Sequence, residues 1–153
     1  MARLQAGDPA PPFSLAADDG STVSLSDLAG TTVVLYFYPK DDTSGCTAEA
    51  CEFRDLQGDY DAAGARVIGV SPDPLESHVK FRDAHGLPFT LLSDPDHEVA
   101  SAYGVWVQKS MYGRDYMGVE RSTFVIGPDG VLKEALYKVK PRGHAASVLE
   151  LVA

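Results

Sequence analysis

The sequence predicts an α/β protein with a mixed central β-sheet flanked by helices. Runs of β-branched and aromatic residues alternate with helical segments along the chain, which favours parallel strands connected by helices. Near the C-terminus, two short apolar runs flank a Gly-Pro-Asp-Gly turn, which adds at least one antiparallel pair. The chain has 153 residues, of which 44% are hydrophobic, and it contains no linker-like stretch. We therefore expect a single domain over residues 1–153.

The first half of the chain predicts a hairpin, a buried strand and a long helix. Residues 12–25 carry two half-apolar runs around an Asp-Asp-Gly turn signal, and a short helix is expected to follow. Residues 31–39, TTVVLYFYP, are typical of a strand buried on both faces. Thr43 or Ser44 can then cap a helix that continues to about residue 60.

The second half repeats the alternation of strand and helix. The expected elements are a strand, a helix, a strand and a helix, at residues 65–71, 73–86, 89–94 and 95–104. Residues 105–118 are aromatic, rich in glycine and without periodicity, and they predict a long surface loop. Residues 121–137 predict the strand–turn–strand unit, and residues 143–153 an amphipathic C-terminal helix.

Charge and composition exclude several classes of function. The formal net charge is −9, which argues against nucleic acid or an anionic membrane as a partner. No apolar run approaches the roughly 20 residues that cross a bilayer. The first residues, MARLQAGDPAPPFSL, lack the apolar core of a signal peptide, so we expect a cytoplasmic location. In that compartment, cysteines are more often catalytic, metal-binding or redox-active than permanently paired.

The two cysteines of the chain, Cys46 and Cys51, lie close together after the strand at 31–39. Cys46 falls in the first turn of the predicted helix, where unpaired backbone N–H groups and the positive end of the helix dipole favour a thiolate. Active sites of α/β proteins also lie at the carboxyl ends of strands. We predict a reactive thiolate at Cys46, and the alternative is a buried structural cysteine.

The spacing of the cysteines constrains their chemistry. Within a helix, five residues correspond to a rise of about 7.5 Å and a rotation of about 140°, so Cys46 and Cys51 point to different sides. A disulfide between them therefore requires the helix to unwind locally. A metal site is not expected, because no histidine shows ligand spacing to either cysteine; the histidines are His78, His85, His97 and His144.

The loop before the helix offers further candidates. Pro39 ends the strand and could shield the thiolate from water. Thr43 lies three residues before Cys46, so it could cap the helix, direct its hydroxyl to the thiolate pocket, or do both. Residues 40–42, Lys-Asp-Asp, are expected to form a solvated loop.

A cation is expected near the thiolate, and two arginines are candidates. Arg121 opens a predicted strand, and Arg54 lies two helical turns beyond Cys46 on the same broad face. A guanidinium holds an anion with paired, fixed donors. Spacing does not distinguish between Arg121 and Arg54.

These residues together resemble a known family. The pattern P-x-x-x-T-x-x-C is present as Pro39, Thr43 and Cys46, within the stretch FYPKDDTSGCTAEACEFRD. The later segments YGVW, MYG and YMGVERSTFVIGPDG are also similar to that family. The chain resembles the peroxiredoxins over nearly its whole length, and among them the peroxiredoxin Q group, also called bacterioferritin comigratory protein.

The resemblance implies a thioredoxin-like fold with an N-terminal β-hairpin extension and a thiol-dependent peroxidase. It implies that Cys46 is the nucleophile that attacks the peroxide and that Cys51 resolves the product as an intramolecular disulfide. The remaining implied roles belong to the surroundings of the thiolate. Thr43 and Arg121 would orient the peroxide, Pro39 would shield the pocket, and Glu49 would position the arginine.

The resemblance also implies partners. The substrate would be hydrogen peroxide or an organic hydroperoxide, the reductant thioredoxin or a similar dithiol, and no cofactor would be needed. We expect a monomer, since no C-terminal arm with a distant cysteine is present. Ser44 departs from the family, which usually has proline there, and it makes the loop less rigid.

Other classes of protein remain as alternatives. A peroxide-sensing redox switch would use the same reactive cysteine but pass the signal to a partner. A thiol–disulfide oxidoreductase is disfavoured because C-x-x-C is missing, and a cysteine-type glutathione peroxidase because its glutamine and tryptophan motifs are not recognised. A structural domain with incidental thiols would show no special sensitivity to peroxide.

Overall fold

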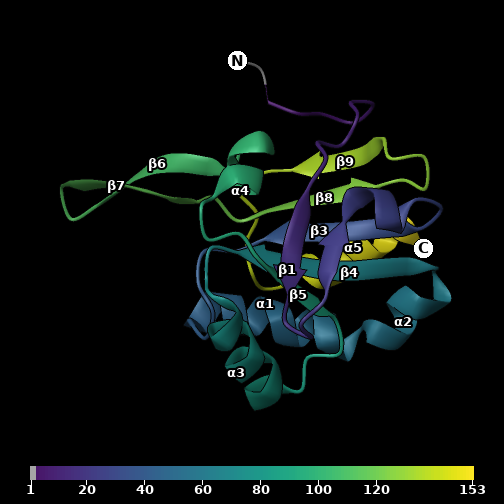
Figure 1. Ribbon diagram of the computed structural model, residues 1–153, viewed down its shortest axis with the longest axis horizontal. Coiled ribbons are helices and arrows are strands. Elements are labelled where there is room, and N and C mark those ends of the chain that lie inside the picture. Colours follow the sequence, from purple (N-terminus) through teal and green to yellow (C-terminus); the bar gives the residue numbers. More distant parts are fainter. Residues whose placement is uncertain (1–2) are drawn as a thin grey trace.

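The centre of the molecule is a mixed β-sheet (Figure 1). A computed structural model describes residues 3–153. Seven strands pair in the order β2-β1-β5-β4-β3-β8-β9. The three central strands are parallel: β3 (Thr32–Phe37), β4 (Ala65–Ser71) and β5 (Thr90–Ser93). The outer strands pair antiparallel: β1 (Ser14–Ala17), β2 (Thr22–Ser24), β8 (Ser122–Ile126) and β9 (Leu132–Leu136). The predicted mixed sheet is confirmed.

Strand β3 shows why this sheet has two buried faces. Successive side chains of a strand point to opposite faces. Val34 and Tyr36 belong to the apolar cluster on one face, and Val33, Leu35 and Phe37 to the cluster on the other. Residues 33–37 are all at most 1% exposed, which explains the uninterrupted apolar run in the sequence.

Helices cover the sheet unevenly. The face that carries Tyr36 is covered by α1 (Ser44–Asp55), α2 (Gln57–Ala62), α3 (Leu75–His85) and α5 (His144–Val152). The opposite face is covered by the N-terminal segment, the short 3-10 helix η1 (Leu25–Leu28) and α4 (Glu98–Ala102). Figure 1 shows α1, α2 and α3 on one side of the sheet and α4 on the other. Within residues 3–153, no helix is long and apolar enough to cross a membrane.

The predicted long helix from residue 43 to about 60 is two helices. Leu56 leaves helical geometry, with φ −100° and ψ 9°, and so separates α1 from α2. The change of direction brings α2 onto β4, where Tyr60 is fully buried. Periodicity alone does not reveal a break at a residue such as leucine, which has a high helix propensity.

The predicted surface loop at residues 105–118 is wrong, because this segment is a β-hairpin. Strand β6 (Trp106–Met111) pairs with β7 (Arg114–Val119) through a two-residue turn. Both turn residues, Tyr112 and Gly113, have positive φ, at 53° and 76°, as a type I′ turn requires. The hairpin projects from the body of the molecule (Figure 1), so most of its side chains face solvent and show no alternation.

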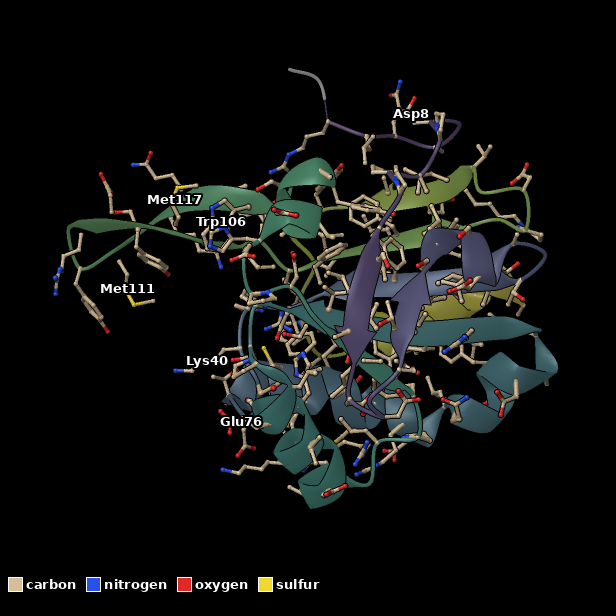
Figure 2. All side chains as sticks on the ribbon, in the orientation of Figure 1. Asp8, Lys40, Glu76, Trp106, Met111 and Met117 are labelled. Atoms are coloured by element: carbon tan, nitrogen blue, oxygen red, sulfur yellow. The ribbon has the colours of Figure 1, made fainter. Side chains whose placement is uncertain are left out.

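The projecting hairpin is anchored at its base. The Trp106 ring stacks on the His97 ring, with centroids 3.8 Å apart and planes 4° apart. Figure 2 shows Trp106 near the body of the molecule, and Met111 and Met117 farther out along the hairpin. Met111 and Met117 are 55% and 50% exposed.

Candidate active site

Cys46 lies where the sequence predicts it, in the first turn of a helix. The N-cap of α1 is Thr43, and Cys46 is the third residue of the helix. Its backbone N–H belongs to the group that has no partner within the helix, and the helix dipole is positive at this end. The side chain is 1% exposed and packs in the apolar cluster that contains Tyr36 and Ala50.

A single arginine joins the thiol to a buried carboxylate. Arg121 donates from Nη2 to the Cys46 sulfur over 3.3 Å and from Nη1 to Glu49 Oε1 over 2.7 Å. Glu49 and Cys46 lie on one side of α1, since they are three residues apart. Gly45 makes the approach possible, because a Cβ there would lie 3.2 Å from Arg121 Nη2 and 3.4 Å from Pro141.

The structure distinguishes between the two candidate arginines. Arg54 donates to the backbone oxygen of His85 over 2.7 Å and pairs with Asp55, so its guanidinium binds the end of α3. The guanidinium beside Cys46 belongs to Arg121. Burial alone would lower the pKa of Arg121, but the neighbouring Glu49 and Cys46 outweigh it and raise the pKa.

Glu49 is a fully buried acid with a shifted pKa. Burial raises the pKa of Glu49 to about 7, although the Arg121 charge opposes the rise. Its second oxygen, Oε2, has no hydrogen-bond partner among the described residues, nor does the buried hydroxyl of Tyr36. At neutral pH, Glu49 therefore exchanges between a neutral and a charged form. In its charged form it shares the Arg121 guanidinium with the Cys46 sulfur.

Thr43 and Pro39 lie in the segment that connects β3 to α1. Thr43 is the N-cap residue, but its side chain makes no capping bond and instead donates to the Lys40 carbonyl oxygen over 2.9 Å. Thr43 is an exposed residue, and its hydroxyl oxygen keeps its lone pairs for another donor. Pro39 is half-buried between the end of β3 and this loop.

Cys51 is separated from Cys46 by the intact helix. Both cysteines are free thiols, and α1 runs without interruption through both positions. Cys51 is half-buried on another side of the helix. The expected requirement for local unwinding before a disulfide forms therefore applies to this conformation.

A cavity of about 420 Å³ opens next to Arg121. It lies between the β6–β7 hairpin and the segment after β9, and the hairpin contributes Val107, Lys109 and Tyr116. Burial, together with the nearby Arg121 charge, lowers the pKa of Lys109. The cavity offers room beside Arg121 for a group larger than hydrogen peroxide.

The predicted solvated loop at residues 40–42 is wrong for Asp41. Its side chain is buried and accepts hydrogen bonds from Tyr38 Oη over 2.6 Å and Ser77 Oγ over 2.8 Å, and it lies 2.7 Å from His78 Nδ1. His78 is itself fully buried in α3. Charged residues in a short loop usually indicate solvation, so sequence reasoning had no signal for this network. Lys40 does point to solvent, as Figure 2 shows.

One group of acids and histidine has ligand atoms close enough to hold a metal. In the described part of the chain, only Asp41, Asp73 and His78 place such atoms within 4.8 Å of one another. The group contains neither cysteine, and its atoms bind one another and neighbouring serines.

Comparison with known proteins identifies the family. A family model described as AhpC/TSA family matches residues 6–135. This chain belongs to that family. It is 49% identical to peroxiredoxin Bcp of Bacillus subtilis over 147 residues, which cover 96% of this chain and 94% of the relative. It is 44% identical to peroxiredoxin Bcp of Escherichia coli over 149 residues, covering 97% and 96%.

Solved structures of peroxiredoxins are similar throughout. Xanthomonas campestris peroxiredoxin Q superposes with a TM-score of 0.88 at 42% identity, covering 92% of this chain and 89% of the other. A variant of Xylella fastidiosa PrxQ superposes with a TM-score of 0.93 at 37% identity, covering 99% and 96%. The predicted thioredoxin-like peroxiredoxin fold and the membership of the peroxiredoxin Q group are confirmed. This peroxiredoxin is a thiol peroxidase.

Proposed function

We propose that this peroxiredoxin reduces hydrogen peroxide and organic hydroperoxides with Cys46 as the nucleophile. The observation that carries the proposal is the pair of Arg121 contacts, 3.3 Å to the Cys46 sulfur and 2.7 Å to Glu49. A fixed guanidinium at the N-terminus of α1 stabilises a thiolate and the charge that develops on the departing oxygen. Glu49 keeps that guanidinium in place.

In the first step, the Cys46 thiolate attacks one oxygen of the peroxide. An S–O bond forms, the O–O bond breaks, and the sulfur loses two electrons to give a sulfenic acid. The peroxide proton passes to the other oxygen, which leaves as water or an alcohol, and the sulfenate on Cys46 takes a proton from solvent to become the sulfenic acid. Thr43 supports this proton movement, because its own hydroxyl proton is directed to the Lys40 carbonyl and its oxygen can accept from the peroxide. Pro39 limits the access of water.

In the second step, α1 unwinds and Cys51 attacks the sulfenic sulfur. A disulfide forms between Cys46 and Cys51, and water leaves. Thioredoxin or a similar dithiol then reduces the disulfide by exchange, which restores both thiols and leaves the oxidised reductant. The conformation described above, with two free thiols and an intact helix, corresponds to the reduced enzyme at the start of this cycle.

Organic hydroperoxides are included because of the cavity beside Arg121. Its volume of about 420 Å³ is large enough for an alkyl group, and Val107, Tyr116 and Val139 give part of its lining an apolar surface. One neighbouring structure, the Xanthomonas campestris bacterioferritin comigratory protein, is described for alkyl peroxide reduction activity.

The decisive experiment adds one equivalent of hydrogen peroxide to the reduced protein and measures intact mass and free thiols. We expect a loss of two hydrogens and of both thiols within seconds, followed by continuous turnover when thioredoxin and its reductase are present. Cys46→Ser should abolish both. Two thiols that survive for minutes would refute the proposal, and disulfide formation without turnover by any dithiol would favour a sensing switch.

A further inference from the structure

The loop between β3 and α1 belongs to a hydrogen-bond network that involves groups at the carboxyl ends of three adjacent strands. The carboxyl ends of β3, β4 and β5 lie side by side because these strands are parallel neighbours in the sheet. Tyr38 and Asp41 follow β3, Asp73 follows β4, and the oxygen of Leu92 is offered by β5. Cys46 is not part of this network, so the site described above does not account for it.

The Asp41 carboxylate is the centre of the network. It accepts from Tyr38 and Ser77, and its Oδ2 lies 2.7 Å from His78 Nδ1. His78 Nε2 lies 2.9 Å from the Leu92 carbonyl oxygen, which can only accept, so Nε2 carries a proton. Burial opposes a charge on His78, but the hydrogen bond and charge of Asp41 outweigh it and raise the His78 pKa. Asp41 is thereby bound to α3 and, through His78, to β5.

The peptide group that joins Lys40 and Asp41 is fixed at both of its polar ends. Its carbonyl oxygen accepts the Thr43 hydroxyl over 2.9 Å, and its N–H donates to Asp73 Oδ2 over 2.8 Å. The same Asp73 oxygen accepts from Ser71 Oγ over 2.6 Å, which ties it to the end of β4. A continuous chain of hydrogen bonds thus runs from β4 through Asp73 and this peptide to Thr43.

We propose that Asp73 is a positioning residue that sets the direction of the Thr43 hydroxyl. By holding the N–H of the peptide between Lys40 and Asp41, Asp73 keeps its carbonyl in place as the acceptor of the Thr43 proton. The lone pairs of Thr43 are then presented to the peroxide. This inference rests on the proposed role of Thr43 as the acceptor from the peroxide. Rotation of the peptide would instead free the Thr43 proton and remove the acceptor.

The test is a double-mutant cycle with Thr43→Val and Asp73→Ala, in which the rate constant for oxidation of Cys46 by hydrogen peroxide is measured by stopped flow. We expect Asp73→Ala to slow the reaction roughly tenfold or more, because the peptide between Lys40 and Asp41 loses a charged hydrogen-bond acceptor. In the Thr43→Val background, Asp73→Ala should have almost no further effect. Asp96→Ala, at an exposed aspartate beyond the end of β5, is the matched control and should leave the rate unchanged.

A second readout separates positioning from general disruption of the site. The rate of Cys46 alkylation by iodoacetamide needs the thiolate but no acceptor for a peroxide proton, so Asp73→Ala should leave it within about twofold. Thermal unfolding shows whether the variant is folded, and if it is not, Asp73→Asn replaces it. The neutral amide retains an acceptor oxygen and should give a smaller loss that is again absent in the Thr43→Val background.

The outcomes are distinguishable. Equal losses in both backgrounds, or equal slowing of alkylation and peroxide oxidation, would overturn the inference and leave the proposed function intact. A slow Thr43→Val variant together with an unaffected Asp73→Ala variant would do the same. If Thr43→Val itself reacts at the wild-type rate, the proposed role of Thr43 fails, and the inference fails with it.

Discussion

At the scale of single residues, Arg121 divides one charge between two acceptors. Its two nitrogens reach the Cys46 sulfur and Glu49 Oε1 at the same time, which only a planar, forked cation can do. The side chain is 14% exposed, so solvent screens these contacts little. Loss of the two guanidinium contacts of Arg121 should therefore slow the reaction more than loss of a surface charge would.

We expect Arg121→Lys to slow peroxide oxidation of Cys46 about 10- to 100-fold, because lysine keeps the charge but cannot hold both acceptors. The measurement is the second-order rate constant with hydrogen peroxide. Arg54→Lys serves as the control, since Arg54 binds the end of α3 and should leave the rate unchanged. A slow Arg54 variant with a normal Arg121 variant would reverse this assignment.

Glu49 makes the stability of the protein depend on pH. Its pKa is about 7 in the folded protein, whereas an unfolded glutamate titrates near 4.3. Between these values the folded state holds more protons than the unfolded chain, so rising pH favours unfolding. The stabilisation that the raised pKa of Glu49 adds to the free energy of unfolding is fully present below about pH 4.3 and is lost as pH rises through 7.

Glu49→Gln removes this dependence. Relative to the variant, the wild type should lose on the order of 2–3 kcal/mol of unfolding free energy between pH 5 and pH 8. Urea denaturation of both proteins at the two pH values measures the difference. An unchanged difference would mean that the carboxyl is ionised throughout this range and that its ion pair with Arg121 outweighs its burial.

At the scale of secondary structure, α1 has two roles. It positions the residues of the site, and it has to unwind locally when the proposed disulfide forms. As a helix it places Cys46, Glu49 and Ala50 on the buried side. It is also tied to α5, because Glu52 Oε1 accepts the backbone N–H of Gly143 over 2.8 Å. Formation of the proposed disulfide has to break part of this helix, and the bond to Gly143 resists it.

We expect oxidation to increase hydrogen exchange of the amides in residues 47–51, because their helical hydrogen bonds are lost in the disulfide form. Exchange measured by mass spectrometry before and after one equivalent of peroxide tests this. In Cys51→Ser, peroxide should consume Cys46 once without the change in exchange, and excess peroxide should carry it to the sulfinic acid. Full protection of α1 in the oxidised wild type would rule out this resolving step.

At the scale of the whole molecule, close packing against the sheet restricts substitutions in its central strands. Gly69 in β4 leaves room for the ring of Tyr36, since a Cβ at Gly69 would lie 2.9 Å from Tyr36 Cζ and 3.0 Å from Leu91 Cδ2. Tyr36 in turn stacks on Phe53 of α1, with ring centroids 4.8 Å apart. Packing in the sheet is thereby connected to the helix that carries Cys46.

Gly69→Ala should lower the free energy of unfolding by about 1–3 kcal/mol through overpacking. Gly58→Ala is the matched control, because Gly58 lies in α2 with no atom within 4 Å of its would-be Cβ. In that position alanine should stabilise the protein by about 0.5–1 kcal/mol, since glycine is the poorer helix former. Chemical denaturation of the three proteins compares these values, and equal stabilities would contradict the packing argument.

The sequence by itself determined the features that depend on neighbours along the chain. The apolar run of β3, the start of α1 directly after Thr43 and the position of Cys46 in its first turn follow from local pattern, and the structure confirms them. Helix α3 ends at Gly86, with φ 61°, which agrees with the end at residue 86 expected from the helical pattern. The family resemblance likewise rests on a contiguous motif.

Only the tertiary structure decided which distant groups meet. Arg121 reaches Cys46 across 75 positions of sequence and Arg54 does not, because the order of strands places β8 beside β3. The same holds for Asp41, which looks like a solvated loop residue until the parallel strands bring His78 and Asp73 to it. Hydrogen bonds and ion pairs act over a few ångströms in space, and a sequence states distance only along the chain.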